Sequence, residues 1–159
     1  MVDPIDTLSK LQEALDGGWV VLRPGDIYPD IGAWMDEPGG ATRLTYARVA
    51  GRSVEAIAVF CHNGYLDGIP VFQTGYAVVE AIRRNGVGAD IVSKGIEEMR
   101  KRFARQGAKK FYVEAVVGLN NTASNRLAER LLSDAPEAIV DEISGQSALR
   151  YVKLIECRT

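Results

Sequence analysis

The sequence predicts an α+β (mixed α/β) fold, in which a central, mostly antiparallel sheet of about six to seven strands is flanked by helices. Three stretches rich in Val, Ile, Tyr and Phe follow one another between residues 42 and 82 with short connections, which is typical of an antiparallel meander. After residue 86 the spacing of apolar residues lengthens to that of a helix. Two further strand-like stretches near the C-terminus complete the sheet.

Length and composition predict a single domain over residues 1–159. The chain has 159 residues, of which 47% are hydrophobic and 25% charged, and such a chain needs no disulfide to build a core. No apolar run approaches the roughly 20 residues that span a bilayer, and the acidic start lacks a signal segment. We therefore expect a cytoplasmic protein with no membrane partner. One histidine and two cysteines give no metal-ligand spacing, so no metal is expected.

The first elements are a helix and a short strand. The helix is predicted from Pro4 to about residue 16, because Asp3 can cap it and apolar residues recur at helical spacing. Residues 19–23 predict a strand, and residues 26–41 an irregular, acidic segment.

The remaining elements alternate between a strand-like and a helix-like spacing of apolar residues. Asn120 or Asn121 caps the second of two helices, and Ala123, Leu127 and Leu131 of that helix are expected to face inward. In chain order, we expect strands over 42–50, 53–61 and 69–82, a helix over about 86–106, a strand over 111–117, a helix over about 122–132, and strands over 137–143 and 147–155.

Charge is distributed unevenly. Residues 83–110 hold nine Lys/Arg and three Asp/Glu, whereas the rest of the chain holds ten and eighteen, for a net charge of −2. This asymmetry indicates either an anion-binding region or a solvated helix face. The overall acidity argues against DNA as a partner.

Residues 78–89, with the sequence VVEAIRRNGVGA, join a strand to a helix through a glycine-containing turn. Such a junction can hold phosphate, because glycines let the backbone N–H groups approach and the helix end adds partial positive charge. The patterns of nucleotide triphosphatases and dinucleotide-binding folds are both absent. The pattern that this segment does contain is Arg83-x-x-Gly86-x-Gly88.

This pattern resembles the acyl-CoA pyrophosphate loop of the GNAT acetyltransferase superfamily. Leu22–Asp26 resembles the opening strand and turn of that family, and Asn121-x-x-Ser124-x-x-Leu127 resembles its second CoA-side motif. The resemblance spans most of the chain. It implies a GNAT-like fold and a transferase that takes acetyl-CoA or another acyl-CoA as cosubstrate. Direct transfer to a primary amine of a small molecule, peptide or protein is also implied.

The resemblance assigns roles residue by residue. Backbone N–H groups from Arg84 to Ala89 would cradle the pyrophosphate. Val78 and Val79 would pair with the pantetheine arm and supply an oxyanion-stabilising N–H, and Asn121 would contact the arm from the other side. The expected cofactor-binding residues are Val78, Val79, Arg83, Arg84, Asn85, Gly86, Val87, Gly88, Ala89, Asn121 and Ser124.

Two departures from the family leave the catalytic groups open. The tyrosine that often protonates the departing thiolate is replaced by Ala128, and Leu132 and Ser133 replace a Gly-Phe pair. Amine acylation needs a group that accepts a proton. The candidates are Glu80, His62 and Tyr76, although Glu80 can equally be a solvent-facing residue and His62 a loop cap. Cys61 is interpreted as a core thiol.

The acceptor is expected at residues 26–41, which shape the acceptor groove in this family. Four acidic residues with Tyr28 and Trp34 suit a cationic amine, or else form an acidic surface loop. Two alternative functions stay open: a non-catalytic CoA-binding or regulatory module, favoured by Ala128, and a toxin-type acetyltransferase acting on aminoacyl-tRNA. For the latter, the basic run over 100–110 would bind RNA; the same run could instead meet the 3′-phosphate of CoA. Many members of the family dimerise, so a homodimer is one expected form.

Overall fold

The computed structural model describes residues 3–157. Its elements are α1 (Pro4–Asp16), β1 (Arg23–Pro24), β2 (Ile31–Asp36), β3 (Arg43–Ala50), β4 (Ser53–Leu66), β5 (Ile69–Val78), α2 (Val87–Arg105), β6 (Lys110–Gly118), α3 (Thr122–Leu131), β7 (Glu137–Val140) and β8 (Ser147–Glu156), with short 3-10 turns at Pro38–Gly40 and Glu80–Ile82.

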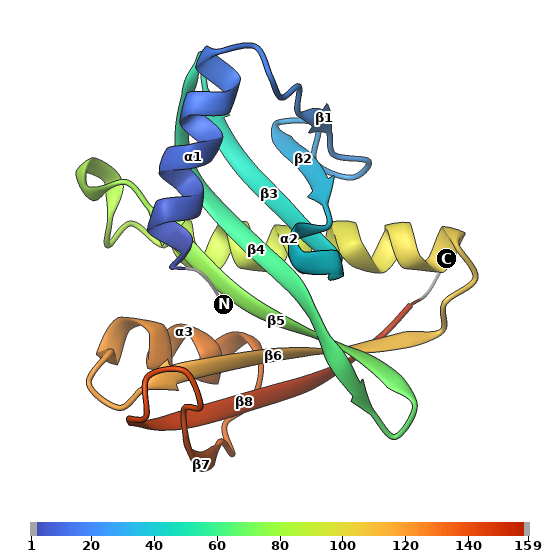
Figure 1. Cartoon of the computed structure of the whole chain (residues 1–159), viewed down its shortest axis with the longest axis vertical. Coiled ribbons are helices and arrows are strands. Elements are labelled where there is room, and N and C mark those ends of the chain that lie inside the picture. Colours follow the sequence, from blue (N-terminus) through green and yellow to red (C-terminus); the bar gives the residue numbers. More distant parts are fainter. Residues whose placement is uncertain (1–2, 158–159) are drawn as a thin grey trace.

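The strands form one sheet in the order β1-β2-β3-β4-β5-β6-β8-β7 (Figure 1). All neighbouring strands are antiparallel except β5 and β6, which are parallel. The expected α+β architecture is confirmed, with eight strands in place of about six to seven. The additional strand is β2, which lies in the segment that was expected to be irregular.

Helices cover both faces of the sheet. α1 packs on one face through Leu8 and Leu11, which contact a cluster of buried residues that includes Ile57 of β4. α2 and α3 pack on the other face, where Ile91 and Met99 of α2 are fully buried. In Figure 1, α1 lies in front of the sheet and α2 behind it.

The helix boundaries agree with the caps expected from sequence. The Asp3 carboxylate accepts a 3.1 Å hydrogen bond from the Ile5 N–H at the start of α1. The Asn121 side chain accepts a 3.1 Å bond from the Ser124 N–H at the start of α3. Both side chains satisfy N–H groups that the first turn of a helix leaves without an intrahelical acceptor.

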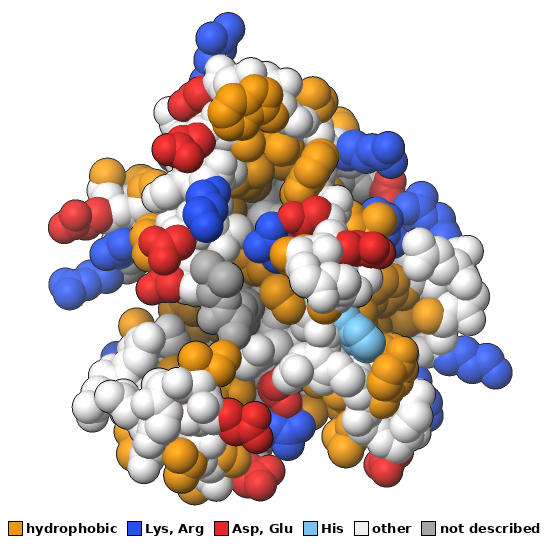
Figure 2. Space-filling model, in the orientation of Figure 1, with side chains coloured by type: hydrophobic (Ala, Val, Ile, Leu, Met, Phe, Trp, Pro, Cys, Tyr) orange, Lys and Arg blue, Asp and Glu red, His pale blue; other side chains and the backbone are white. Residues whose placement is uncertain are grey.

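The first predicted strand is largely wrong. Of residues 19–23 only Arg23 joins the sheet, and Trp19 and Val21 are 79% and 78% exposed. Hydrophobic side chains gather at the top of the space-filling view, beyond the end of α1 (Figure 2). The acidic segment contains a strand that the sequence did not predict, since β2 pairs along its whole length with β3.

Three other boundaries differ from expectation. β4 continues through the predicted loop to Leu66, because a bulge after His62 keeps it paired with β5. β5 ends at Val78, and the segment expected to extend it to residue 82 forms a 3-10 turn. β7 ends at Val140. In α3 the buried residue is Ala128, and Leu127 and Leu131 pack against the core as expected, whereas Ala123 is exposed.

The parallel pair β5–β6 is short. Only Val71–Gln73 pair with Tyr112–Glu114, after which the two strands separate. We call the space between residues 74–78 of β5 and residues 115–118 of β6 the wedge. The missing ladder leaves one edge of each strand facing a gap within the sheet.

Candidate functional site

Two adjoining cavities lie in this region. One occupies the wedge, and the other lies between the wedge and the N-terminus of α2. The wedge cavity has a volume of about 340 Å³ and is lined by residues 73–76 of β5, 115–118 of β6, Val92 and one side of α3. The loop cavity has a volume of about 670 Å³ and extends from Tyr76 to the N-terminus of α2. The two cavities share the lining residues Asp3, Tyr76, Asn121, Ser124 and Leu127.

The turn before α2 presents backbone N–H groups to the loop cavity. Arg84 and Gly86 adopt left-handed backbone conformations, with φ of 68° and 74°. The Asp90 N–H donates to the Gly86 carbonyl at 3.0 Å. As in any helix, the preceding N–H groups of Val87, Gly88 and Ala89 have no intrahelical acceptor. These three residues line the cavity, so their N–H groups are available to an anion.

Tyr76 connects β5 to both helices. Its hydroxyl lies 3.0 Å from the Ser124 Oγ, and the two groups share a hydrogen bond. A Cβ atom added to Gly88 would lie 2.6 Å from Tyr76 Cε2, closer than real Cβ atoms approach. Gly88 is therefore required for the close packing of α2 on the tyrosine ring, which forms the wall common to the two cavities.

Arginines dominate the charge of the loop cavity. Arg83, Arg84, Arg126 and Arg130 line it, and among residues 3–157 the one carboxylate in its lining is that of Asp3. Arg83 Nε donates a 2.8 Å hydrogen bond to the Val78 carbonyl, which holds that guanidinium against the end of β5. The two arginines of α3 were not anticipated. Their spacing of four residues on a helix predicts a common face, and only the fold shows that this face meets the loop.

The wedge cavity has a polar end and an apolar end. Asp3 at the start of α1 and Asp141 before β8 lie at the polar end. The apolar end is formed by buried side chains of α2, β6 and α3. Thr74 also lines this cavity, and its buried Oγ1 has no hydrogen-bond partner within residues 3–157.

Most predicted binding residues meet in this site. Val79 belongs to the hydrophobic cluster under α1, and Asn85 donates a 3.3 Å hydrogen bond to the Ile82 carbonyl, so neither lines a described cavity. The predicted residues that line the loop cavity are Val78, Arg83, Arg84, Gly86, Val87, Gly88, Ala89, Asn121 and Ser124.

Of the three catalytic candidates, the fold brings only Tyr76 to the described cavities. Glu80 is exposed on the 3-10 turn beyond β5 and does not extend the strand. His62 lies on β4, where its ring contacts those of Tyr65 and Phe72 at centroid distances of 5.1 and 5.5 Å. Its Nε2 is buried and has no hydrogen-bond partner among residues 3–157.

The acidic segment 26–41 lies away from the wedge. In strand order, β3 and β4 separate β2 from β5. Asp26 pairs with Arg105, and the Tyr28 ring lies 5.3 Å below Lys94 Nζ. These contacts occupy two of the groups that the sequence suggested for a cationic acceptor.

The basic run over 100–110 lies at the far end of α2. Arg100 is 13 residues from the first residue of the helix, which corresponds to about 20 Å. Its Nε donates a 2.8 Å hydrogen bond to the Glu156 carbonyl. Placement therefore favours the solvated-face interpretation of this run.

Cys61 has the properties of a structural thiol. Its side chain is partly buried beside the cluster under α1, and this burial is the main reason why the pKa of the thiol is raised. A raised pKa lowers the thiolate fraction at neutral pH, so an activated nucleophile is not indicated.

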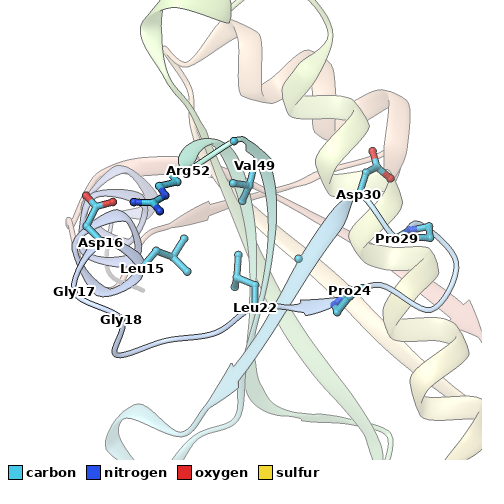
Figure 3. A pocket seen from close by; sticks show the side chains of 12 residues that line it. Leu15, Asp16, Gly17, Gly18, Leu22, Pro24, Pro29, Asp30, Val49 and Arg52 are labelled. Atoms are coloured by element: carbon cyan, nitrogen blue, oxygen red, sulfur yellow. The ribbon is translucent and has the colours of Figure 1, made fainter.

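A larger cavity, of about 880 Å³, lies outside this site. It is formed between the end of α1, β2 and the β3–β4 turn, where Leu15, Leu22 and Val49 point inward and Asp16 and Arg52 lie at the rim (Figure 3). Its described lining contains none of the predicted site residues. Size alone therefore does not identify the functional cavity.

Two further features concern the described part of the chain. No group of three or more His, Cys, Asp and Glu side chains within residues 3–157 could hold a metal ion. None of the helices described there is long and apolar enough to cross a membrane.

Comparisons with solved structures identify the fold. RimL, a ribosomal L7/L12 α-N-protein acetyltransferase in complex with coenzyme A, aligns with a TM-score of 0.55 and 14% identity over 73% of this chain and 64% of its own. A GNAT-family acetyltransferase from Streptococcus pneumoniae aligns with a TM-score of 0.53 and 13% identity, over 97% of this chain and 96% of its own. A ribosomal-protein-alanine N-acetyltransferase from Brucella melitensis aligns with a TM-score of 0.53 and 15% identity, over 97% of this chain and 80% of its own. This chain spans just under two thirds of the RimL length.

No protein-family model and no curated sequence matches the chain. The similarity is therefore one of fold, visible in the arrangement of the elements and not in sequence identity.

Proposed function

Because the chain has the fold of the GNAT acetyltransferases, we propose that it is an acyl-CoA-dependent N-acyltransferase, with acetyl-CoA as the reference donor. The observation that carries the proposal is the continuity of the two cavities. An arginine-lined cavity at a helix N-terminus opens, past Tyr76, into a gap between two separating strands.

The loop cavity matches the charged part of coenzyme A. The diphosphate would accept hydrogen bonds from the N–H groups between Arg84 and Ala89, aided by the helix dipole. Arg126 and Arg130 of α3 face the same space and would add charge-assisted bonds to phosphate.

The pantetheine arm would lie along the open edge of β5. Pairing with β6 stops at Gln73, so the following main-chain groups on that edge are free to bond the amides of the arm. From Val78 to Thr74 the strand covers about 13 Å at 3.3 Å per residue, which brings the thiol end of the arm into the wedge. A main-chain N–H there would stabilise the oxyanion.

Transfer would then be direct. The unprotonated amine attacks the thioester carbonyl, and the nitrogen of the tetrahedral intermediate loses a proton to solvent. The intermediate then collapses with cleavage of the C–S bond, and the departing thiolate takes up a proton. Tyr76 is our candidate for the donor of that proton, because its hydroxyl lies on the wall common to both cavities and is oriented by Ser124.

The acceptor would approach from the side of α1. Asp3 and Asp141 lie at this end of the wedge cavity, and their charges favour a protonated amine before it is deprotonated for attack. This placement moves the cationic acceptor from the segment over 26–41 to the mouth of the wedge. We propose a primary amine of a small molecule, a peptide or a protein.

Calorimetry with CoA and acetyl-CoA tests the donor site. Gly86→Glu places a carboxylate in the turn that would hold diphosphate, and it should abolish binding. Gly107→Glu is the matched control, because it also carries a left-handed φ, of 84°, but lies beyond the other end of α2. No binding by the folded native chain, or equal binding by both variants, would contradict the proposal.

A second candidate, the non-catalytic CoA-binding module, is favoured by one observation. Ala128 offers no proton at the position where many relatives carry a tyrosine. Thiol release in the presence of amines distinguishes the two, and Tyr76→Phe should reduce that release without changing the Kd for CoA. The tRNA alternative gains no support from the structure, because the basic run lies at the far end of α2.

A further inference from the structure

The apolar end of the wedge cavity is built from three elements that meet behind the gap in the sheet. No charged side chain belongs to this end in the described part of the chain. Its residues are Val92 of α2, Ala115 and Val117 of β6, Leu127 and Ala128 of α3, and Leu132 directly after α3.

Ala128 lies at the inner wall of this end. It is 1% exposed, yet it lines the cavity, so its methyl group forms part of the floor. It follows Ser124 by four residues, one turn further along the same face of α3. A larger side chain at this position would fill the volume between α3, β6 and α2.

The wedge cavity is a cleft that opens to solvent, and the buried apolar side chains form its inner wall. The wedge cavity, at about 340 Å³, falls in the size range of small-ligand sites, roughly 300–1,000 Å³. Apolar walls at the end where a thioester would be held point to a hydrocarbon ligand.

We propose that this end is an acyl-chain site, and that the preferred donor carries a straight, saturated acyl group longer than acetyl. The inference rests on the proposed function, because CoA must place its thiol beside Tyr76 and Ser124. Ser124 and Ala128 are separated by about 6 Å along the helix axis, a distance that an acetyl methyl does not span but a four-carbon chain does.

The opposite end of the cavity does not compete for the chain. Asp3 and Asp141 lie there, and methylene groups placed against carboxylates would gain little from leaving water. The two ends therefore separate the substrates, with the acyl chain toward α3 and the amine toward α1.

Calorimetric titration of the native protein with CoA and with acetyl-, propionyl-, butyryl- and hexanoyl-CoA tests the proposal. Each buried methylene should tighten the Kd about fourfold relative to acetyl-CoA, until the chain reaches the end of the cavity. Affinity that stays equal or falls beyond acetyl would overturn the acyl-chain site. Absence of CoA binding would instead contradict the proposed function.

Filling the site gives an independent test. Ala128→Leu should remove most of the gain for butyryl-CoA, by about tenfold, and leave the Kd for CoA within twofold. Glu129→Leu is the control, since this neighbouring residue is exposed on the same helix and lines neither cavity. Full retention of the butyryl preference in folded Ala128→Leu would contradict the proposal. If that variant does not fold, the native chain-length series still decides.

Discussion

The two ends of α2 both carry arginines, but they use them differently. At the C-terminal end Arg105 forms an ion pair with Asp26, and Arg100 bonds Glu97 and the Glu156 carbonyl. At the N-terminal end Arg84, which precedes the helix, and Arg130 of the neighbouring α3 line the loop cavity, and neither forms an ion pair with a carboxylate within residues 3–157. A cation that already has a partner contributes to the fold, whereas one that lines a cavity without a carboxylate partner is available to an anion. Charge density along the sequence does not distinguish the two cases.

The largest effect on stability is expected in the anchored half of the helix, at Glu98. This carboxylate is 4% exposed and accepts a 2.8 Å hydrogen bond from the Ile27 N–H. Glu98→Ala leaves that N–H unsatisfied and should lower the free energy of unfolding by about 3 kcal/mol in urea titrations. The Kd for CoA of the folded variant should not change. Glu98→Gln retains an acceptor and should cost less than half as much.

Gly88→Ala should affect the open end of the helix. The added Cβ displaces the Tyr76 ring, at a cost of about 1–3 kcal/mol in the free energy of unfolding. Because that ring separates the two cavities, the Kd for CoA should also rise about tenfold. Gly95→Ala is the matched control, since a Cβ there would lie 2.8 Å from Phe60 Cε2, also on α2, and Gly95 lines neither cavity. An unchanged Kd would show that the Tyr76 wall does not contribute to the donor site.

Arg130→Ala should weaken binding without affecting stability. Loss of one charge-assisted bond to phosphate is expected to raise the Kd for CoA about tenfold, from about 1.5 kcal/mol of binding energy. The loss should shrink in high salt, because exposed charges are screened. Calorimetry at two salt concentrations measures both effects. Equal Kd values for native and variant at low salt would place the phosphates elsewhere.

The smallest effect is expected for Arg105→Ala. Its ion pair with Asp26 is largely exposed, so the free energy of unfolding should fall by at most about 1 kcal/mol. The Kd for CoA should be the same as in the native chain. A rise comparable to that of Arg130→Ala would contradict the division of roles between the two ends of the helix.

The helices were predictable because their signals are local. Asp3 and Asn121 cap them, and the apolar residues of α2 repeat on one face. Edge strands were not predictable in the same way. The segment over 19–22 has the residues of a strand but no partner, whereas β2 has weak strand residues but pairs with β3 throughout. Pairing is decided by neighbours that are distant in sequence.

The candidate site likewise contains residues that could be predicted from local sequence and residues that could not. The turn from Arg83 to Ala89 is one continuous segment, so its sequence was sufficient to predict that most of its residues line one cavity. Thr74 and Arg130 gave no signal, because the separation of β5 from β6 and the packing of α3 bring them to the cavities. Glu80 was misplaced for a related reason, since the sequence did not show that β5 ends at Val78.

The short parallel seam between β5 and β6 also has a consequence for folding and hydrogen exchange. Its partners are about 40 residues apart in sequence, whereas β3, β4 and β5 are joined by tight hairpins. Pairing of distant segments is slow, so we expect the meander to form before β6 docks. In the native state, β6, β8 and α3 should open together as one cooperative unit, exposing their amides while the meander stays protected. A molecule bound across the gap would join the two units and slow that exchange.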